Sequence, residues 1–296
     1  MWFKNVQAFH FMEAFRMSPE ALSTELSHYA FRQIRPGEVQ SRGWANPNDE
    51  EASPLVYPAN GFFLICLRTE DKMVPSSVVR EMLSERLEEW EQKEGRKAYK
   101  KEKEQLKDEV FQSLLGRAFS KNGRIYGLID PVDGWLFIDA ASSKKAELFT
   151  TELRRALGSL RIQLPPVDKV STILTSWVRQ QKVPSEFKLL DHLVIEDLKT
   201  DGLIRAQNLD LFSEEIQSLL EPSREVIQLA LSWCEQLSFV LKQDFSVKSL
   251  KFLGGVKTQA SEIFTETAAQ QFDADFVIMA ETLRAFWRSL YGSFKK

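Results

Sequence analysis

The chain has 296 residues, of which 43% are hydrophobic, and its formal net charge is −3. This length allows two or three compact units with cores of their own, and the hydrophobic fraction is ordinary for a globular protein. The net charge excludes a uniformly basic nucleic-acid-binding protein. Any contact with phosphates therefore has to come from a local concentration of Lys and Arg.

The first third of the chain predicts strands, one helix and a long loop region. Residues 2–16 alternate partly and indicate a strand. Ser18-Pro19-Glu20 predicts the start of a helix that runs to about Phe31, with serine as the N-cap and proline in the first turn. Proline and glycine punctuate residues 35–60, and Phe62 to Arg68 indicates a buried strand.

Residues 76–116 predict a hairpin of two helices. The first has apolar residues at helical spacing, namely Val79, Met82, Leu83, Leu87 and Trp90. Gly95 marks the turn between the helices. The second helix ends in Val110, Phe111, Leu114 and Leu115, and we expect Gly116 to stop it in the left-handed conformation.

Basic residues concentrate in the middle of this hairpin. Only Glu94, Glu102 and Glu104 oppose the seven basic residues of the run, so its local net charge is +4. The run consists of Lys93, Arg96, Lys97, Lys100, Lys101, Lys103 and Lys107. Helical spacing predicts one side with Lys93, Lys97, Lys100 and Lys101, and another with Arg96, Lys100, Lys103 and Lys107. Such a run is either a solvated face or a surface that contacts phosphates.

The residues after Gly116 favour phosphate contact. Arg117, Lys121 and Arg124 continue the basic run, and Phe119 lies between two of them. Phe119 is either a core residue at a helix end, or an exposed ring that packs on a partner chain or on a base. Stacking on a base is the weakest option, because bases in an intact duplex offer no free face.

The remaining sequence predicts a β-hairpin and then a mixed body. Ile125 to Ile129 and Trp135 to Ala140 predict strands that are joined by a turn at Asp130 to Gly134. A helix should run from Ser142 or Ser143 to Leu157. Beyond the proline pair at 165–166, we expect helices at 170–178, 258–271 and 276–294, a short helix at Ser213, and strands between them.

Short pieces in fixed order over nearly the whole chain resemble the bacterial recombination-associated RdgC family. The pieces are Trp2-Phe3-Lys4-Asn5, Leu106-Lys107-Asp108-Glu109-Val110, Ser113-Leu114-Leu115, Arg117-Ala118-Phe119-Ser120, Ala141-Ser142, Lys144-Lys145-Ala146-Glu147, Leu157-Gly158-Ser159-Leu160, Ile204-Arg205-Ala206, Ser213-Glu214-Glu215-Ile216 and Gln271-Phe272-Asp273-Ala274-Asp275-Phe276. The resemblance implies a homodimer that closes as a ring around double-stranded DNA and restrains the recombinase RecA. It also implies that Phe119 is the gate where the two tips meet.

The expected fold is α+β, with an elongated multi-subdomain monomer, a projecting helical hairpin and a ring-shaped homodimer. We divide the chain into a central α/β body (1–75 and 117–165), the basic hairpin or tip (76–116) and a second α+β body used for dimerisation (166–296). The resemblance also implies a finger loop at Arg205, Gln207, Asn208 and Leu209. The family usually has a Lys-Gln pair there, and this chain has Asn208-Leu209 in its place.

No sequence pattern predicts an enzyme or a cofactor. There is no glycine-rich phosphate loop followed by Lys-Ser or Lys-Thr, and His10, His28 and His192 lie far apart along the chain. The best carboxylate set for a metal-dependent nuclease is Asp273, Asp275 and Glu281, but we expect the two aspartates to cap the last helix. We therefore expect a DNA-binding protein that is not an enzyme. The alternatives are a protein that acts on a recombination partner and a metal-dependent DNA-processing enzyme.

The expected location is the cytoplasm, in association with the nucleoid. Cys66 and Cys234 both lie in apolar stretches, as is typical of small core residues in a reduced protein. Polar residues interrupt the apolar character of the first ten positions, and the longest apolar runs are too short to cross a bilayer. We expect no membrane partner.

Overall fold

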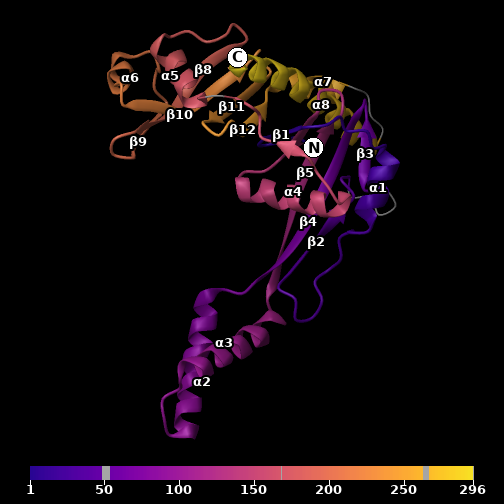
Figure 1. Ribbon diagram of the computed structural model, residues 1–296, viewed down its shortest axis with the longest axis vertical. Helices are drawn as coiled ribbons and strands as arrows, with labels where there is room; N and C mark the ends of the chain where they lie inside the picture. Colours follow the sequence, from indigo (N-terminus) through magenta and orange to yellow (C-terminus); the bar gives the residue numbers. More distant parts are fainter. Residues whose placement is uncertain (49–53, 168, 263–266, 296) are drawn as a thin grey trace. The chain divides into compact units, whose positions relative to one another are not determined.

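The structure is a computed structural model that describes residues 1–48, 54–167, 169–262 and 267–295. Its described part contains helices and two antiparallel sheets, so the predicted α+β class is confirmed (Figure 1). The first sheet has the strand order β2-β4-β5-β6-β1-β7, with β3 also paired to β4. The second has the order β12-β11-β10-β8-β9.

The elements follow one another along the chain with these bounds. The N-terminal half contains β1 (Gln7–Phe11), α1 (Pro19–Ser27), β2 (Gln40–Ala45), β3 (Val56–Ala59), β4 (Phe62–Met73), α2 (Ser76–Glu94), α3 (Lys100–Leu115), β5 (Phe119–Asp130), β6 (Trp135–Ile138) and α4 (Ser143–Leu157). The C-terminal half contains β7 (Ile162–Gln163), α5 (Val170–Arg179), β8 (Phe187–Asp197), β9 (Gly202–Gln207), α6 (Glu214–Leu219), β10 (Arg224–Trp233), β11 (Leu237–Lys242), β12 (Val247–Phe252), α7 (Gly254–Glu262) and α8 (Ala268–Phe294).

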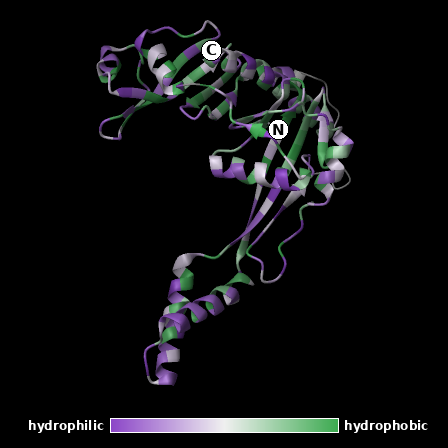
Figure 2. Ribbon diagram, viewed as in Figure 1, coloured by the Kyte–Doolittle hydropathy of each residue, from purple (hydrophilic) through white to green (hydrophobic). Residues whose placement is uncertain are grey.

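The chain divides into two compact units. The larger unit consists of Met1–His28, Asn46–Cys66 and Ile125–Lys296, and the smaller one of Tyr29–Ala45 and Leu67–Arg124. Helices α2 and α3 belong wholly to the smaller unit, while β4 and β5 each pass from one unit to the other. In Figure 2 most of α2 and α3 is coloured hydrophilic, whereas much of the sheets is hydrophobic.

Helix α8 is the centre of the core of the larger unit. Its Trp287 ring meets the rings of Trp135 and Phe137 at centroid distances of 5.5 and 5.4 Å, and both partners lie on β6 of the first sheet. Its Phe286 ring lies 4.8 Å from that of Phe239 on β11 of the second sheet. One continuous hydrophobic cluster therefore includes residues of both sheets and of α8. The three-part domain division stays a prediction.

A buried carboxylate connects the β5–β6 turn to α8. Asp130 is fully buried, and its Oδ1 accepts hydrogen bonds from the backbone N–H groups of Val132 (3.0 Å) and Asp133 (3.2 Å). Arg284 donates to both carboxylate oxygens at 2.7 Å. One turn further along α8, Arg288 forms an ion pair with Asp133 nearer the surface.

Several predicted elements agree with the structure. Ser18 caps α1, since its Oγ accepts a hydrogen bond from Ala21 N–H, and Gly95 ends α2 with φ +67°. The β-hairpin turn at 130–134 and the helix that runs to Leu157 are present as predicted. Ser213 caps the short helix α6.

Other predictions were wrong in their bounds. Helix α1 ends at Ser27 and not near Phe31, because Tyr29 and Phe31 turn to pair with Trp44. Strand β5 begins at Phe119 and β4 runs on to Met73, so both are longer than predicted. The predicted helix 258–271 is two helices, and residues 263–266 of that range lie outside the described residues.

Three predictions about individual residues were also wrong. Gly116 has φ −64° and not a left-handed conformation, since the chain leaves α3 by a right-handed turn. Helix α8 begins at Ala268 with Thr267 as its N-cap, which places Asp273 and Asp275 beyond the first turn. Cys66 is buried as predicted, but Cys234 is exposed in the tight connection after β10.

Among the described residues, no helix is both long and apolar enough to cross a membrane.

We expect Asp130→Ala to lower the free energy of unfolding by about 3–5 kcal/mol, because the largely buried Arg284 would lose its carboxylate partner. Chemical denaturation of purified protein measures this loss. The matched control is Arg161→Ala, which removes an ion pair with Glu13 whose two side chains are 73% and 69% exposed, so its loss should be clearly smaller. Equal losses in the two variants would contradict the importance of Asp130.

Candidate nucleic-acid interface

The connection between α2 and α3 is closed by local hydrogen bonds. Gly95 N–H donates to the carbonyl of Glu91 at 3.0 Å, and its positive φ reverses the chain. The Glu91 side chain accepts from Ala98 N–H at 3.0 Å. Glu102 accepts from Tyr99 N–H at 2.7 Å and so satisfies a free donor at the start of α3. The seven basic residues at 93–107 are therefore divided among two helices and a connection.

This division corrects the predicted helical sides. Lys93 lies on α2, Arg96 and Lys97 lie in the connection, and the other four lie on α3. Helical spacing therefore cannot place Lys93 or Lys97 beside Lys100 and Lys101. It does hold within α3, where Lys100, Lys103 and Lys107 lie at positions i, i+3 and i+7 on one side.

Arg96 differs from the lysines of the run, because it already has partners within the chain. Its guanidinium donates to both oxygens of Glu102 at 2.6 and 3.0 Å. It also lies over the rings of Trp90 and Tyr99 at 4.8 and 4.7 Å from their centroids. The hydrogen bonds from Arg96, followed by that from Tyr99 N–H, lower the pKa of Glu102 to about 2. The structure thus gives Arg96 a role in closing the hairpin, and its contact with DNA stays a prediction.

The six lysines of the run are exposed, and none forms a salt bridge with any residue that the structure describes. They are Lys93, Lys97, Lys100, Lys101, Lys103 and Lys107. Their charges are available to an anionic partner. The smaller unit as a whole carries 17 Lys and Arg against 13 Asp and Glu, a net charge of +4, whereas the rest of the chain has −7.

One side of the hairpin gathers positive charge. Lys100, Lys103 and Lys107 line a hollow of about 330 Å³ together with Leu83 and Glu104. Leu83 and Lys107 also line an adjoining hollow, to which Arg80 of α2 contributes. We call Lys100, Lys103, Lys107 and Arg80 the lysine face. The two hollows are thus lined by these four cations and by one carboxylate, that of Glu104.

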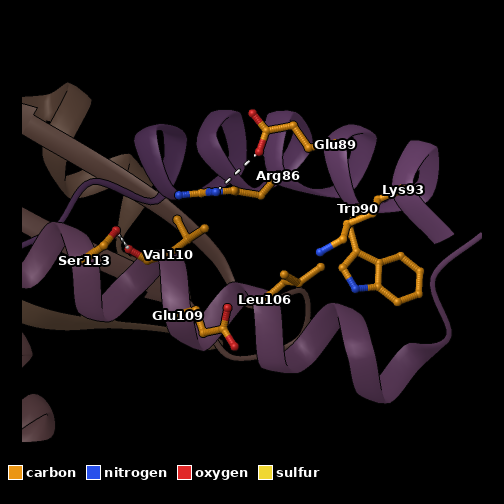
Figure 3. Close-up of a pocket in the computed structure, with 8 residues that line it drawn as sticks. All are labelled: Arg86, Glu89, Trp90, Lys93, Leu106, Glu109, Val110 and Ser113. Atoms are coloured by element: carbon orange, nitrogen blue, oxygen red, sulfur yellow. Dashed lines mark hydrogen bonds and ion pairs between the residues drawn. The ribbon is translucent and has the colours of Figure 1, made fainter.

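A groove on another side of the hairpin has balanced charge. Figure 3 shows Trp90 and Leu106 between the two helices, with Arg86 and Lys93 on α2 and Glu109 on α3. Arg86 lies within 3.4 Å of Glu89 on its own helix. Two cations and two carboxylates thus line this groove. Of the two sides, the lysine face is therefore the candidate surface for phosphates.

A second group of candidates follows α3 on the first residues of β5. Phe119 is 86% exposed, so it is not a core residue of its own chain, and that alternative was wrong. Arg117 and Lys121 are exposed, and Arg124 is half-buried further along the strand. Phe119 and Lys121 lie two residues apart, so their side chains point to the same face of β5.

Sequence reasoning missed two cations that belong to these groups. Arg80 joins the lysine face only through the pairing of α2 with α3, which leaves no local signal. Lys72 donates from Nζ to the carbonyl of Ala118 at 3.0 Å, directly before Phe119. It could have been found only by extending β4 beyond Arg68.

The predicted finger residues lie in the larger unit. Arg205 and Gln207 are exposed on β9, Asn208 has φ +56°, and Leu209 is exposed in the loop that follows. Their role in DNA binding stays a prediction. The ten basic candidates and Phe119, in contrast, all lie in the smaller unit.

The candidate carboxylates for metal-dependent chemistry do not converge on one site. Asp273 accepts a hydrogen bond from the Tyr57 hydroxyl at 3.1 Å, and Glu281 accepts one from the Asn60 amide. Asp275 forms an ion pair with the Met1 amino group at 2.9 Å. Within the described residues, no group of three or more His, Cys, Asp or Glu side chains could hold a metal ion.

Comparison with known proteins agrees with the resemblance found in the sequence. A family model described as "Putative exonuclease, RdgC" matches residues 1–296. The chain belongs to the RdgC family. The recombination-associated protein RdgC of Aeromonas hydrophila is 37% identical over 295 residues, which cover 99% of this chain and 97% of the relative. The proteins of that name from Yersinia enterocolitica and Yersinia pestis are 37% identical over 292 residues, covering 98% of this chain and 96% of each relative.

The two descriptions within the RdgC family differ in what they claim. The family description names an exonuclease, whereas the relatives are named for an association with recombination. The smaller unit provides six hairpin lysines that form no salt bridge with any described residue, and an exposed aromatic ring. These features suit the binding of a polyanion more directly than they suit the hydrolysis of one.

We expect the Glu102 carboxylate of the folded protein to titrate near its pKa of about 2. Because this pKa lies below the ordinary value of 4.5, the Arg96–Glu102 contact stabilises the hairpin above about pH 4.5. That stabilisation should disappear as the pH falls toward 2. Carbon-detected NMR of the carboxyl group measures the midpoint. In Arg96→Ala the midpoint should rise toward 4.5, and an unchanged midpoint would contradict the assignment.

Proposed function

We propose that this chain binds double-stranded DNA independently of sequence, as a homodimeric ring that encircles the duplex. The lysine face is the observation that carries the proposal, since Lys100, Lys103 and Lys107 lie on one side of α3 and form no salt bridge with any described residue. Membership of the RdgC family and the relatives' association with recombination agree with a role on DNA.

Binding follows from charge alone. Each lysine that neutralises a phosphate releases a counterion from the DNA, and this gain does not depend on the base sequence. The residues outside the smaller unit have a net charge of −7, which disfavours broad contact of their surface with duplex DNA and leaves room only for local basic sites. Duplex DNA should therefore be bound mainly at the hairpin.

The exposed ring of Phe119 supports the gate. The side chain of Phe119 is 86% exposed, so its burial against a second chain would stabilise the contact between the two chains. Arg117 and Lys121 on either side of it can hold phosphates close to this contact. In the proposed homodimer the larger units form one contact and the two Phe119 tips form the other. A closed ring holds DNA by topology and needs no contacts with base edges.

The proposed role in recombination is to restrain RecA. A recombinase filament has to reach the duplex in order to test it for homology. A ring that occupies the duplex competes for the same DNA, so the restraint needs no direct contact with RecA. Regulation through a direct recombination partner remains the first alternative, and the exposed aromatic and apolar side chains of the hairpin, such as Tyr99, favour it.

A metal-dependent DNA-processing enzyme is the second alternative, because the family description names an exonuclease. We propose that the chain is not an enzyme and needs no cofactor. End-labelled duplex and single-stranded DNA incubated with the protein and Mg²⁺ or Mn²⁺ should stay intact. Cleavage that stays with the protein through successive purification steps would overturn this proposal, and its loss in Asp273→Asn would assign it to the carboxylates of α8.

We expect the double variant Lys100→Ala and Lys103→Ala to bind duplex DNA more weakly for every sequence tested. Its plot of log affinity against log salt should be shallower by about two units, since each lost phosphate contact removes about 0.9. Filter binding or anisotropy over a salt series measures the slope. The control is Lys144→Ala with Lys145→Ala, which removes two exposed lysines from α4 in the larger unit. Equal slopes in both variants would remove the lysine face from the binding site.

We expect Phe119→Ser to fold normally, because an exposed side chain changes the free energy of unfolding by no more than about 0.5 kcal/mol. Linear DNA should still bind, since the lysines are intact. Retention on closed circular DNA at high salt should fall sharply, because an open ring cannot trap its ligand. Val132→Ser, another exposed apolar residue, serves as the control. If Phe119→Ser is retained on circular DNA as well as the control is, Phe119 is not the gate.

A further inference from the structure

A pocket of about 360 Å³ in the larger unit has no part in the proposed duplex binding. It is lined by the aromatic rings of Trp2 and Phe252 and by three lysines, Lys4, Lys251 and Lys257, with no carboxylate among the lining residues. All three lysines are exposed, and no described residue forms a salt bridge with any of them. Its volume lies in the range of small-ligand sites.

A strained bulge in β12 builds one wall of this pocket. Ser238 and Val240 of β11 pair with Lys251 and Lys248 of β12, so two residues, Ser249 and Leu250, oppose the single residue Phe239. Ser249 has φ +49°, a conformation that L-residues other than glycine rarely adopt. Bulges often re-aim side chains next to functional sites.

The bulge changes which side chains face the pocket. Leu250 and Phe252 are each only 4% exposed, whereas Lys251 between them is exposed to solvent. In a regular strand, residues three positions apart point to opposite faces, so Lys248 and Lys251 would do so if β12 had no bulge. With it, both point away from the core, and Lys251 lines the pocket while Lys248 reaches the carbonyl of Ala140.

The N-terminal segment supplies the opposite wall and is fixed on both sides. Leu250 N–H at the bulge donates to the carbonyl of Lys4 at 2.8 Å, and Val6 and Val247 exchange two backbone hydrogen bonds. The carboxylate of Asp139 accepts from the N–H groups of Lys4 and Asn5 at 3.2 and 2.9 Å. Lys4 is thereby held beside the pocket, with its side chain free to reach a ligand.

The aromatic rings determine the class of ligand. Trp2 lies 4.8 Å from the ring of Phe252 at an interplanar angle of 53°, and the half-buried indole lines the cavity. A flat aromatic surface beside cations is the arrangement that binds unpaired nucleotides, whose bases stack while their phosphates are neutralised. An acidic peptide would use the lysines but not the rings. A paired base in a duplex offers no free face to them.

We propose that this pocket binds an unpaired nucleotide of a DNA strand, with its base against Trp2 and its flanking phosphates at Lys4, Lys251 and Lys257. The site is separate from the lysine face of the hairpin. It would let the protein recognise single-stranded regions without using the surface proposed for duplex DNA.

The test uses the full chain and a fluorescein-labelled oligothymidylate of twelve nucleotides, measured by anisotropy at low salt. We expect Lys4→Glu combined with Lys251→Glu to weaken this binding by at least about tenfold, because two phosphate contacts become repulsive. Lys182→Glu, an exposed lysine of the same unit outside the pocket, should change it by less than about twofold. Trp2→Leu, which keeps an apolar side chain but removes the flat ring, should weaken binding by at least about fivefold.

Three other probes identify the ligand. A twelve-residue abasic strand should bind the unaltered protein at least about tenfold more weakly than oligothymidylate, since it has phosphates but no bases. Thymidine monophosphate at an equal concentration should not displace the strand, and a twelve-residue glutamate peptide should not match its affinity. Equal affinity for the abasic strand would reduce the pocket to a charged patch. Displacement of the strand by the mononucleotide would assign the pocket to a free nucleotide. An affinity for the peptide that equals the affinity for the strand, and that the same variants abolish, would assign the pocket to an acidic protein partner.

The two sites can be tested independently. The pocket variants are also measured in the background of Lys100→Ala with Lys103→Ala, so that strand binding by the hairpin does not hide their effect. Lys4→Glu with Lys251→Glu should leave the affinity for a blunt 40-base-pair duplex within about twofold. If oligothymidylate binding in either background is as strong in the pocket variant as in Lys182→Glu, the nucleotide site is wrong, whatever the outcome for duplex DNA.

Discussion

The buried carboxylate of Asp130 is the interaction on which the larger unit depends. A charge with no access to water is tolerated only where partners replace the lost hydration, and Asp130 has four such contacts. Its partner Arg284 also lies 3.9 Å over the ring of Phe62 on β4. This arrangement joins β4, the β5–β6 turn and α8. It fixes the position of α8, so that Trp287, three residues further on, meets the rings of Trp135 and Phe137.

The chain uses its two kinds of cation differently. Arg284, Arg288 and Arg96 each form a two-pronged contact with a carboxylate, for which a planar guanidinium is well suited. The side chains left without partners on the hairpin are mainly lysines, whose compact and strongly hydrated charges adapt to phosphates at many positions. These arginines thus fix the fold, whereas the hairpin lysines provide charge that no salt bridge among the described residues neutralises. This division explains how a chain of net charge −3 can present a positive surface.

Local chemistry could be predicted from the sequence, and pairing between distant segments could not. The cap at Ser18 and the reversal at Gly95 depend on neighbouring residues, so both predictions were confirmed. The prediction for Gly116 was wrong because the chain continues from α3 by a right-handed turn into β5, which pairs with β4. The exposure of Phe119, the first residue of β5, could likewise not be predicted from its neighbours in sequence. At the candidate site, the charge run revealed the lysines, but Arg80 and Lys72 contribute only through helix pairing and strand extension. Asp273 and Asp275 resembled caps, although Thr267 with Gln270 already caps α8 six residues earlier.

The proposed gate would have to open easily in order to admit DNA without a free end, and the exposed ring of Phe119 suits that requirement. In a dimer already held through the larger units, the second contact closes at an effective concentration of about 1 mM, which corresponds to about 4 kcal/mol. Burying one phenylalanine side chain contributes about 1.5–3 kcal/mol, so a pair of Phe119 rings supplies about 3–6 kcal/mol. The two terms nearly balance, and the closed and open forms of the proposed ring would both be populated. A larger apolar surface at this position would close the ring permanently, whereas a polar residue would leave it open. In the proposed ring, one exposed phenylalanine among cations would therefore set the contact near the point where loading and retention are both possible.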